Sequence, residues 1–206
     1  MTGRTITDVT SWWATQVHER NEATKAAGRW RVIREFDALG PSGTLSSAEG
    51  PVVSFASNDY LGLTAHPAVV AAAHSALERW GAGSGASRLV TGARPVHREL
   101  EEGLADWKGT EAALLFPTGF AANLGVLSTL ARPGTLVCSD ELNHASIIDG
   151  CRLGRAEVRI YRHRDVEHLE ELLQLADGPV IVVTDTVFSM DGDEAPVAEI
   201  ATACAR

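Results

Sequence analysis

The sequence predicts an α/β protein with three layers, in which a mostly parallel sheet lies between two sets of helices. Two observations lead to this fold class. From residue 112 onward, apolar runs of strand length alternate with helical segments, which is typical of parallel strands joined by crossover helices. The run Val180–Val183 is apolar without alternation, as expected for a strand that helices cover on both faces.

The composition is that of an ordinary soluble globular protein. The chain has 206 residues, of which 45% are hydrophobic and 22% charged, and its formal net charge is −9. The acidic balance argues against a general nucleic-acid or membrane-surface binder. No apolar run approaches the roughly 20 residues that span a bilayer, and no signal peptide is evident. Three cysteines without metal-ligand spacing fit a reducing cytoplasm, and no metal site is expected.

The chain is expected to divide into an N-terminal helical arm and linker, residues 1–51, and a main α/β domain, residues 52–206. The first part holds little apolar surface to bury, so we do not expect it to fold by itself. A polar helix is predicted over residues 8–27. The segment 40–51 is rich in glycine, proline and serine and is predicted to be irregular.

The main domain is predicted to open with a short strand at 52–55 and with helices at 68–80 and 95–108, each introduced by a proline. The glycine-rich stretch 81–92 is either a flexible connector or a backbone packed closely beneath a ligand. It follows a helix rather than a strand and lacks the glycine spacing of a dinucleotide fingerprint. A Rossmann NAD(P) enzyme is therefore disfavoured.

After residue 108, predicted strands and helices alternate. The strands cover residues 112–116, 135–139, 158–161 and 180–184. The helices that follow the first three strands cover residues 120–130, 145–153 and 165–176. Asp165 is placed to cap the last of these helices, whose apolar residues fall on one face.

The turn Thr118-Gly119 leads from the strand predicted at 112–116 directly into the helix predicted at 120–130. Such a turn leaves backbone N–H groups free at the helix start, where the positive end of the helix dipole also favours an anion. These features indicate a phosphate site, although strand–turn–helix units without any ligand are common.

In open sheets of this kind, ligands bind at the carboxyl ends of the strands. Three of the predicted strands are followed there by candidate site residues. They are Thr118, Gly119 and Phe120 after the first strand, Asp140, Asn143 and His144 after the second, and Asp185, Ser189 and Asp191 after the fourth. Each residue alone has an ordinary explanation as a turn or helix start. Their joint placement predicts one site that contains a phosphate turn, an imidazole and a hydroxyl.

Five motifs occur in order along the chain. They are Asn58-Asp59-Tyr60-Leu61-Gly62-Leu63, Gly81-Ala82-Gly83-Ser84-Gly85, Thr118-Gly119-Phe120-Ala121-Ala122-Asn123, Asn143-His144-Ala145-Ser146 and Phe188-Ser189-Met190-Asp191-Gly192-Asp193. The set resembles the α-oxoamine synthases, pyridoxal-phosphate (PLP) enzymes of the fold-type I aminotransferase superfamily. The stretch Ser87-Arg88-Leu89-Val90-Thr91-Gly92 most resembles one branch, the 8-amino-7-oxononanoate synthases of biotin biosynthesis. The resemblance implies an incomplete large domain of aminotransferase fold type I.

The resemblance implies a PLP-dependent acyltransferase that condenses an amino acid with an acyl-CoA and releases carbon dioxide. In the branch named above, the substrates would be L-alanine and a pimeloyl thioester. The cofactor would act as the electron sink. Enzymes of the 2-amino-3-ketobutyrate CoA ligase, 5-aminolevulinate synthase and serine palmitoyltransferase types remain alternatives. The resemblance also implies a cytoplasmic homodimer with shared active sites.

The motifs carry over four cofactor contacts. The backbone at Gly119 and Phe120 would hold PLP near its phosphate. His144 would stack on the pyridine ring and assist proton transfer, and Ser189 would hydrogen-bond near the ring's phenolic oxygen.

The motifs also imply contacts with the two substrates. Asn58 would contact the carboxylate of the amino acid across a dimer interface. Arg29 would contact the acyl substrate, and Arg31 matches the family pattern nearly as well. An arginine suits this role because its planar fork binds a carboxylate in a bidentate manner.

One part of the family pattern is missing. PLP chemistry of this type requires a lysine Schiff base and a carboxylate on the pyridinium nitrogen. The only lysines are Lys25 and Lys108, neither in the family's Ser/Thr-x-x-Lys context, and none of the predicted strands ends in the family's Asp-x-x-His motif. We expect the N-terminal half of an enzyme, inactive by itself. The alternative is a non-catalytic fragment that binds a partner or the cofactor.

Overall fold

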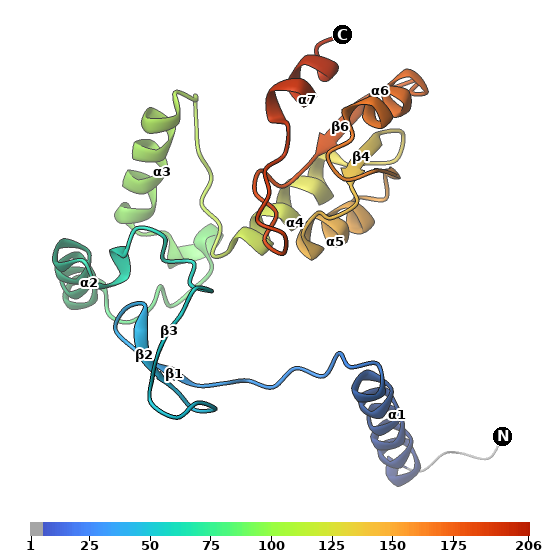
Figure 1. Cartoon of the computed structure of the whole chain (residues 1–206). Helices are drawn as coiled ribbons and strands as arrows, with labels where there is room; N and C mark the ends of the chain where they lie inside the picture. The colour runs from blue at the N-terminus through green and yellow to red at the C-terminus, as the bar shows by residue number, and fades with distance from the viewer. Residues whose placement is uncertain (1–5) are drawn as a thin grey trace. The chain divides into compact units, whose positions relative to one another are not determined.

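The structure is a computed structural model that describes residues 6–206, with side chains from residue 11 onward (Figure 1). The described chain divides after Gly92 into two compact units: unit 1, which ends at Gly92, and unit 2, Ala93–Arg206. The division between arm and main domain that the sequence suggests, after residue 51, does not coincide with this boundary and remains a prediction. None of the described helices is long and apolar enough to cross a membrane.

Unit 1 contains a small antiparallel sheet, with helices before and after its strands in the sequence. Its elements are α1 (Ile6–Ala26), β1 (Phe36–Asp37), β2 (Ser42–Leu45), β3 (Pro51–Val53), the 3₁₀ turn η1 (Leu63–Ala65), α2 (Pro67–Trp80) and the π-helical turn η2 (Arg88–Gly92). The strands lie in the order β1-β2-β3. The helices predicted at 8–27 and 68–80 are confirmed within two residues.

The prediction of an irregular segment at 40–51 is wrong, because β2 lies inside it. Gly43 is needed there: a Cβ at this position would lie 2.3 Å from the carbonyl oxygen of Asp37. Pro51 is tolerated because it begins the edge strand β3. Glycine and proline indicate a loop in the sequence, but here they allow the chain to form closely packed antiparallel strands.

The glycine-rich stretch 81–92 ends in tightly packed backbone rather than a plain connector. The Gly92 N–H donates to the Ser87 carbonyl at 2.9 Å within η2. A Cβ at Gly92 would lie 1.8 Å from the carbonyl oxygen of Ala86. The close approach is thus made by the chain to itself, and only glycine fits there.

Unit 2 is a three-layer α/β structure. Its elements are α3 (Pro95–Lys108), α4 (Gly119–Leu130), β4 (Leu136–Asp140), α5 (Ala145–Gly154), β5 (Glu157–Tyr161), α6 (Val166–Gln174), β6 (Val180–Val183) and α7 (Val197–Cys204). The strands are all parallel and lie in the order β5-β4-β6. The predicted fold class is confirmed.

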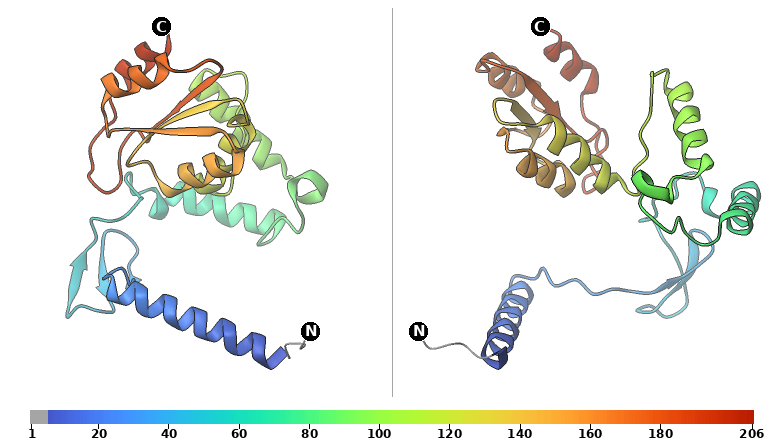
Figure 2. Two further views of the ribbon diagram at one scale, coloured as in Figure 1. Left: turned by 90° about the vertical axis from the view of Figure 1, so that its right-hand side faces the viewer. Right: turned by 180° about the vertical axis from the view of Figure 1, so that it is seen from behind.

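Helices cover both faces of the sheet (Figures 1 and 2). On one face, α4 and α5 pack against β4 and β6 through Leu127, Ala131, Val137, Ile147 and Cys151. On the other face, α6 and α7 pack through Leu136, Cys138, Tyr161, Leu169, Phe188 and Ile200. All five residues of β4 are buried, as expected for the central strand of such a sheet.

The strand predicted at 112–116 is wrong. Residues 112–116 belong to no strand among the described residues. The Leu115 N–H donates to Oε1 of Glu101 at 2.8 Å, a side chain on α3 rather than a neighbouring strand. Phe116 packs its ring against Gly125 of α4, where a Cβ would lie 2.8 Å from the ring. The apolar composition of residues 112–116 therefore did not predict whether they form hydrogen bonds with a neighbouring strand.

Two glycines allow α4 and α5 to approach closely. Gly150 and Gly154 lie one turn apart on α5, and both are buried. A Cβ at Gly150 would lie 2.9 Å from Cβ of Leu127, and one at Gly154 would lie 2.2 Å from the carbonyl oxygen of Ala131. A backbone neighbour cannot turn aside as a side chain can. The distance between the two helices is therefore set by these glycines.

We predict that Gly154→Ala destabilises the protein by about 1–3 kcal/mol, because α5 must move away from the backbone of α4. The matched control is Gly103→Ala in the middle of α3, where a Cβ would meet nothing within 4 Å. That change is expected to be neutral or to stabilise by up to about 1 kcal/mol. Urea unfolding followed by circular dichroism measures both, and equal effects would contradict the packing argument.

Candidate functional site

The start of α4 presents free backbone donors. Thr118 is the N-cap, and its Oγ1 accepts from the Ala121 N–H at 3.0 Å. Within the described chain, the N–H groups of Gly119 and Phe120 have no hydrogen-bond acceptor. Two such donors and the positive end of the helix dipole favour an anion, and the anion site itself remains a prediction.

The ring of His144 is held in one orientation at the start of α5. Its Nδ1 accepts from the Ser146 N–H at 3.2 Å and lies 2.7 Å from the Ser146 Oγ. Ser146 is fully buried, and its Oγ accepts from Nδ2 of Asn123 on α4 at 2.9 Å. A backbone N–H can only donate, so Nδ1 keeps its lone pair and the neutral ring carries its proton on Nε2.

Two aromatic rings lie near each other at the starts of α4 and α5. The centroids of Phe120 and His144 are 6.4 Å apart, and the ring planes meet at 84°. Both side chains are exposed to solvent. The structure therefore brings Gly119, Phe120 and His144 into one locality, with an imidazole beside the free donors of α4.

The loop after β4 is fastened to the end of β6. Asn143 is buried; its Nδ2 donates to the Val183 carbonyl at 2.8 Å, and its Oδ1 accepts from the Asp185 N–H at 2.8 Å. The Asp185 Oδ2 accepts from the His144 N–H at 2.8 Å. The chain passes from β4 outward to β5 and then back across to β6, so the two fastened ends form a topological switch point.

Ser189 lies in a tight hairpin after β6. Val187 and Glu194 pair across it, and the Phe188 N–H donates to the Asp193 carbonyl at 2.9 Å. Phe188 is 2% exposed and belongs to the core, whereas Ser189 itself is exposed at the tip. The hairpin leaves the same edge of the sheet as His144. Among the described residues, no hydrogen bond joins Ser189 to His144.

A cluster centred on His163 was missed by the sequence reading. His163 follows β5, with Nδ1 2.9 Å from Oδ1 of Asp140 and Nε2 2.9 Å from Oδ2 of Asp193. The rule that directs attention to strand ends was applied to the other strands but not to β5, although it would have found this residue.

Asn58 and Arg29 belong to unit 1. Asn58 is an exposed residue of the turn that Asp59 stabilises by accepting from the Leu63 N–H at 2.8 Å. Arg29 and Arg31 are exposed in the stretch after α1. Because the two units are separate bodies, the substrate contacts of Asn58 and of Arg29 or Arg31 remain predictions.

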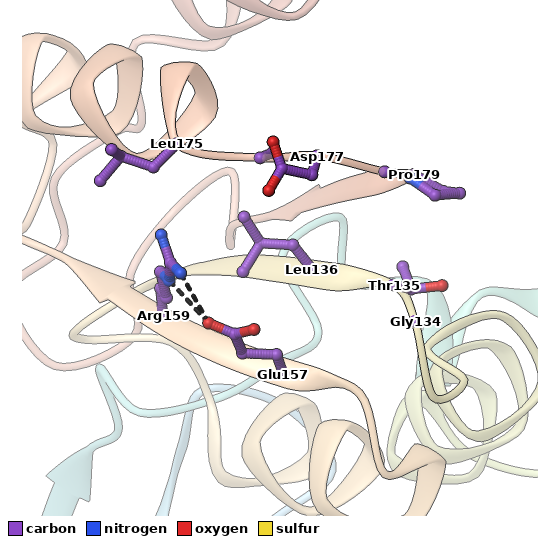
Figure 3. Close-up of a pocket in the computed structure, with 10 residues that line it drawn as sticks. Gly134, Thr135, Leu136, Glu157, Arg159, Leu175, Asp177 and Pro179 are labelled. Atoms are coloured by element: carbon purple, nitrogen blue, oxygen red, sulfur yellow. Dashed lines mark hydrogen bonds and ion pairs between the residues drawn. The ribbon is translucent and has the colours of Figure 1, made fainter.

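A pocket lies beside the amino ends of the strands of unit 2, whereas Gly119, His144 and Ser189 follow the carboxyl ends (Figure 3). It has a volume of about 300 Å³ and is lined at the amino ends of β4, β5 and β6 by residues that include Leu136, Glu157, Arg159 and Pro179. The guanidinium of Arg159 is already paired with Glu157 at 2.8 Å. None of the predicted site residues lines this pocket.

Comparison with known families identifies the class. Residues 50–206 match the model of the family described as aminotransferase class I and II. The match covers most of the chain, and the fold agrees with it. The chain belongs to the aminotransferase class I and II family.

Curated relatives give a finer comparison within this family. The chain is 46% identical over 188 residues to an 8-amino-7-oxononanoate synthase of Thermoanaerobacter pseudethanolicus, which covers 89% of this chain and 47% of that protein. The predicted resemblance to these synthases is confirmed. The chain spans about half the length of the curated relatives that it matches.

Solved structures show the same fold. A serine palmitoyltransferase from S. paucimobilis with a bound PLP–myriocin aldimine matches with a TM-score of 0.81 and 33% identity, over 98% of this chain and 50% of that one. The 8-amino-7-oxononanoate synthase of Francisella tularensis matches with a TM-score of 0.62 and 29% identity, over 72% of this chain and 41% of that one. The predicted aminotransferase fold type is confirmed.

We predict that the neutral ring of His144 is protonated on Nε2 and bare on Nδ1, because the Ser146 N–H occupies Nδ1. Long-range ¹H–¹⁵N NMR spectra of the neutral ring measure the tautomer directly. Ser146→Ala removes the hydroxyl partner but keeps the backbone N–H, so the same tautomer is expected with a more mobile ring. Protonation on Nδ1 in the unsubstituted protein would contradict the assignment.

Proposed function

We propose that this chain supplies the phosphate-binding and ring-stacking part of a PLP-dependent α-oxoamine synthase. The parent protein would condense L-alanine with a pimeloyl thioester and release carbon dioxide and the thiol. The observation that carries the proposal is the meeting of Phe120 and His144 beside the free N–H groups of α4. The similarity to 8-amino-7-oxononanoate synthases supports the choice of substrates.

The residues present fit this cofactor. The donors of Gly119 and Phe120 suit a phosphate, which favours a helix start with unsatisfied N–H groups. Gly119 has open space where a Cβ would be, so a bulky anion can approach the backbone. The exposed imidazole of His144 suits a planar aromatic ring, and the Ser189 hydroxyl suits a phenolic oxygen. The phosphate, the ring face and the phenolic oxygen thus each have a chemically matched residue at the carboxyl end of the sheet.

Bound PLP would supply an electron sink for the carbanion that forms next to the amino group. The side chains of this chain would orient the cofactor and move a proton. Gly119 and Phe120 would fix the phosphate, and Ser189 would donate to the ring oxygen. His144 would give or take a proton at Nε2 only, because Ser146 occupies Nδ1.

Neither lysine of the chain lies in the family's Ser/Thr-x-x-Lys context. Lys25 pairs with Glu22 at 2.8 Å on α1 in unit 1. Lys108 ends α3, where its Nζ lies 4.5 Å from the centre of the Trp107 ring. The proposal therefore requires a Schiff-base lysine and a pyridinium carboxylate from outside these 206 residues.

A serine palmitoyltransferase activity is the second candidate. The observation in its favour is structural: a protein of that name matches with a TM-score of 0.81, against 0.62 for the synthase from Francisella tularensis. The identity of 46% to a curated 8-amino-7-oxononanoate synthase, against 33% to the palmitoyltransferase, leads us to prefer the first candidate.

The remaining parts of the proposal concern assembly. We propose a cytoplasmic homodimer in which Asn58 reaches the amino-acid carboxylate of the neighbouring subunit's site. Arg29, or Arg31 in its place, would bind the terminal carboxylate of the acyl chain. A dicarboxylic acyl chain needs such a cation, whereas a palmitoyl chain does not.

We predict that Gly119→Pro weakens the binding of pyridoxine 5′-phosphate about tenfold, while Gly119→Ala leaves it nearly unchanged. Proline at the first helical position is compatible with the helix and with the extended Thr118, but it removes one N–H donor. A charge-assisted hydrogen bond of this kind contributes roughly 1.5–3 kcal/mol. Pyridoxine 5′-phosphate is the probe because it has no aldehyde to react with surface lysines.

Isothermal titration calorimetry measures these affinities, with pyridoxine as the control ligand that lacks the phosphate. Both variants should bind pyridoxine equally weakly. Equal affinity of Gly119→Pro and Gly119→Ala for the phosphorylated probe would show that α4 does not hold the phosphate.

For the reaction itself, we predict that the complete gene product releases CoA from pimeloyl-CoA in the presence of L-alanine, and much more slowly from palmitoyl-CoA with L-serine. The 206-residue chain with PLP alone should give no product. Borohydride reduction should trap no PLP adduct at the site. Thiol release and mass spectrometry after reduction measure these outcomes. A preference for serine and palmitoyl-CoA would transfer the proposal to the second candidate.

A further inference from the structure

We propose that His163 is a positioning residue, which fastens the hairpin that carries Ser189 to the carboxyl end of β4. This inference rests on the proposed function, because it assigns to His163 the placement of a proposed cofactor contact. It concerns a residue that lies outside the five motifs. The observations that carry it are the bridge made by the imidazole and the packing around it.

His163 joins two elements that are distant in sequence. Its Nδ1 is 2.9 Å from Asp140 at the end of β4, and its Nε2 is 2.9 Å from Asp193 in the hairpin. Asp140 is 3% exposed. Both ring nitrogens face carboxylate oxygens, which only accept, so both bonds exist together only when the ring carries two protons. The bridge is therefore a cation held between two anions.

Neighbouring contacts fix the bridge in place. The Arg164 N–H donates to Oδ2 of Asp140 at 3.0 Å, and its Nη1 lies 3.0 Å from Oδ2 of Asp193. Arg164 adopts a left-handed backbone conformation with φ of 59°, which a residue with a Cβ takes only when its surroundings require it. The charged groups against His163 are thus Asp140 from β4, Asp193 from the hairpin and Arg164 beside it.

The hairpin is anchored on both sides of Ser189. On one side, the buried ring of Phe188 packs edge-on against His163, with centroids 4.4 Å apart and planes at 87°. On the other side, Asp193 accepts from the Phe188 N–H through its carbonyl and from His163 through its carboxylate. Ser189 directly follows the first anchor, so its position depends on both.

The charge of His163 makes the fastening depend on pH. The hydrogen bond to Asp140 raises the pKa of His163 above the ordinary histidine value of about 6.5, with Asp193 adding to this and burial opposing it. The bridge is complete below about pH 6.5 and is lost as the pH rises through the raised pKa. The pKa of Asp193 is lowered, mainly by its bond to His163, so on the acid side the bridge fails as the pH falls through that lowered pKa.

Amide hydrogen exchange of the ligand-free protein tests this proposal. Protection factors of the Phe188 and Gly192 N–H groups, corrected for the intrinsic pH dependence of exchange, should be highest near pH 6 and fall as His163 titrates. Amides of α5 should show no such change and serve as the internal control. Constant protection of the hairpin from pH 6 to pH 9 would overturn the proposal, and this measurement needs no variant.

Variants isolate the bridge. His163→Gln should lower hairpin protection at pH 6 about tenfold and abolish its pH dependence. Asp193→Asn should have a similar effect, and the double variant should add little, because both changes remove one interaction. His168→Gln is the matched control, since His168 accepts from the Arg162 N–H at 3.0 Å in the same region without contacting the hairpin. Additive losses, or an equal loss in His168→Gln, would overturn the proposal.

Failure of this inference is distinguishable from failure of the proposed function. Gly119 lies at α4, which His163 does not contact among the described residues, so the pyridoxine 5′-phosphate titrations report on the phosphate site alone. A difference between Gly119→Pro and Gly119→Ala together with pH-independent hairpin protection would overturn the role of His163 only. If both hold, His163→Gln and Ser189→Ala should weaken binding of the probe by similar, non-additive factors.

Discussion

The need to satisfy buried polar groups at the end of β4 organises unit 2. The buried polar or charged residues of the described side chains are Ser139, Asp140, Asn143 and Ser146, all within one short stretch. A buried polar group without a partner costs roughly 1–3 kcal/mol. Their partners come from α4, from the loop after β5 and from the segment after β6. Satisfying this stretch therefore holds three other parts of the chain at one edge of the sheet.

The same constraint shapes the proposed site at the carboxyl ends of the strands, and it does not act at the pocket beside their amino ends. At the carboxyl end, Asn123 and Ser146 use their polar atoms on one another and on His144, which leaves the imidazole exposed in a fixed orientation. At the amino end, the side chains of Arg159 and Glu157 pair with each other.

Much of this arrangement could be predicted from the sequence. Hydrophobic periodicity located the helices and β4, β5 and β6, and the strand-end rule brought Gly119, Phe120 and His144 together. Periodicity could not show that residues 112–116 lack a strand partner, because pairing is a property of distant residues. Periodicity also could not show that Gly43 belongs to a strand packed closely against its neighbour rather than to a loop. The bridge of His163 to Asp140 and Asp193 joins residues far apart in the chain, and no local pattern encodes it.

The glycine contact between α4 and α5 also bears on how the site could be altered. Phe120 and His144 lie at the starts of α4 and α5, and the glycines of α5 pack directly against α4. Because these glycines set the distance between the helices, ordinary core substitutions cannot change the spacing of Phe120 and His144. Ser189 stands on an exposed hairpin tip beside Met190, which is 89% exposed. Changes at the exposed tip are accordingly expected to be tolerated, whereas larger residues at the glycine contact would force α4 and α5 apart.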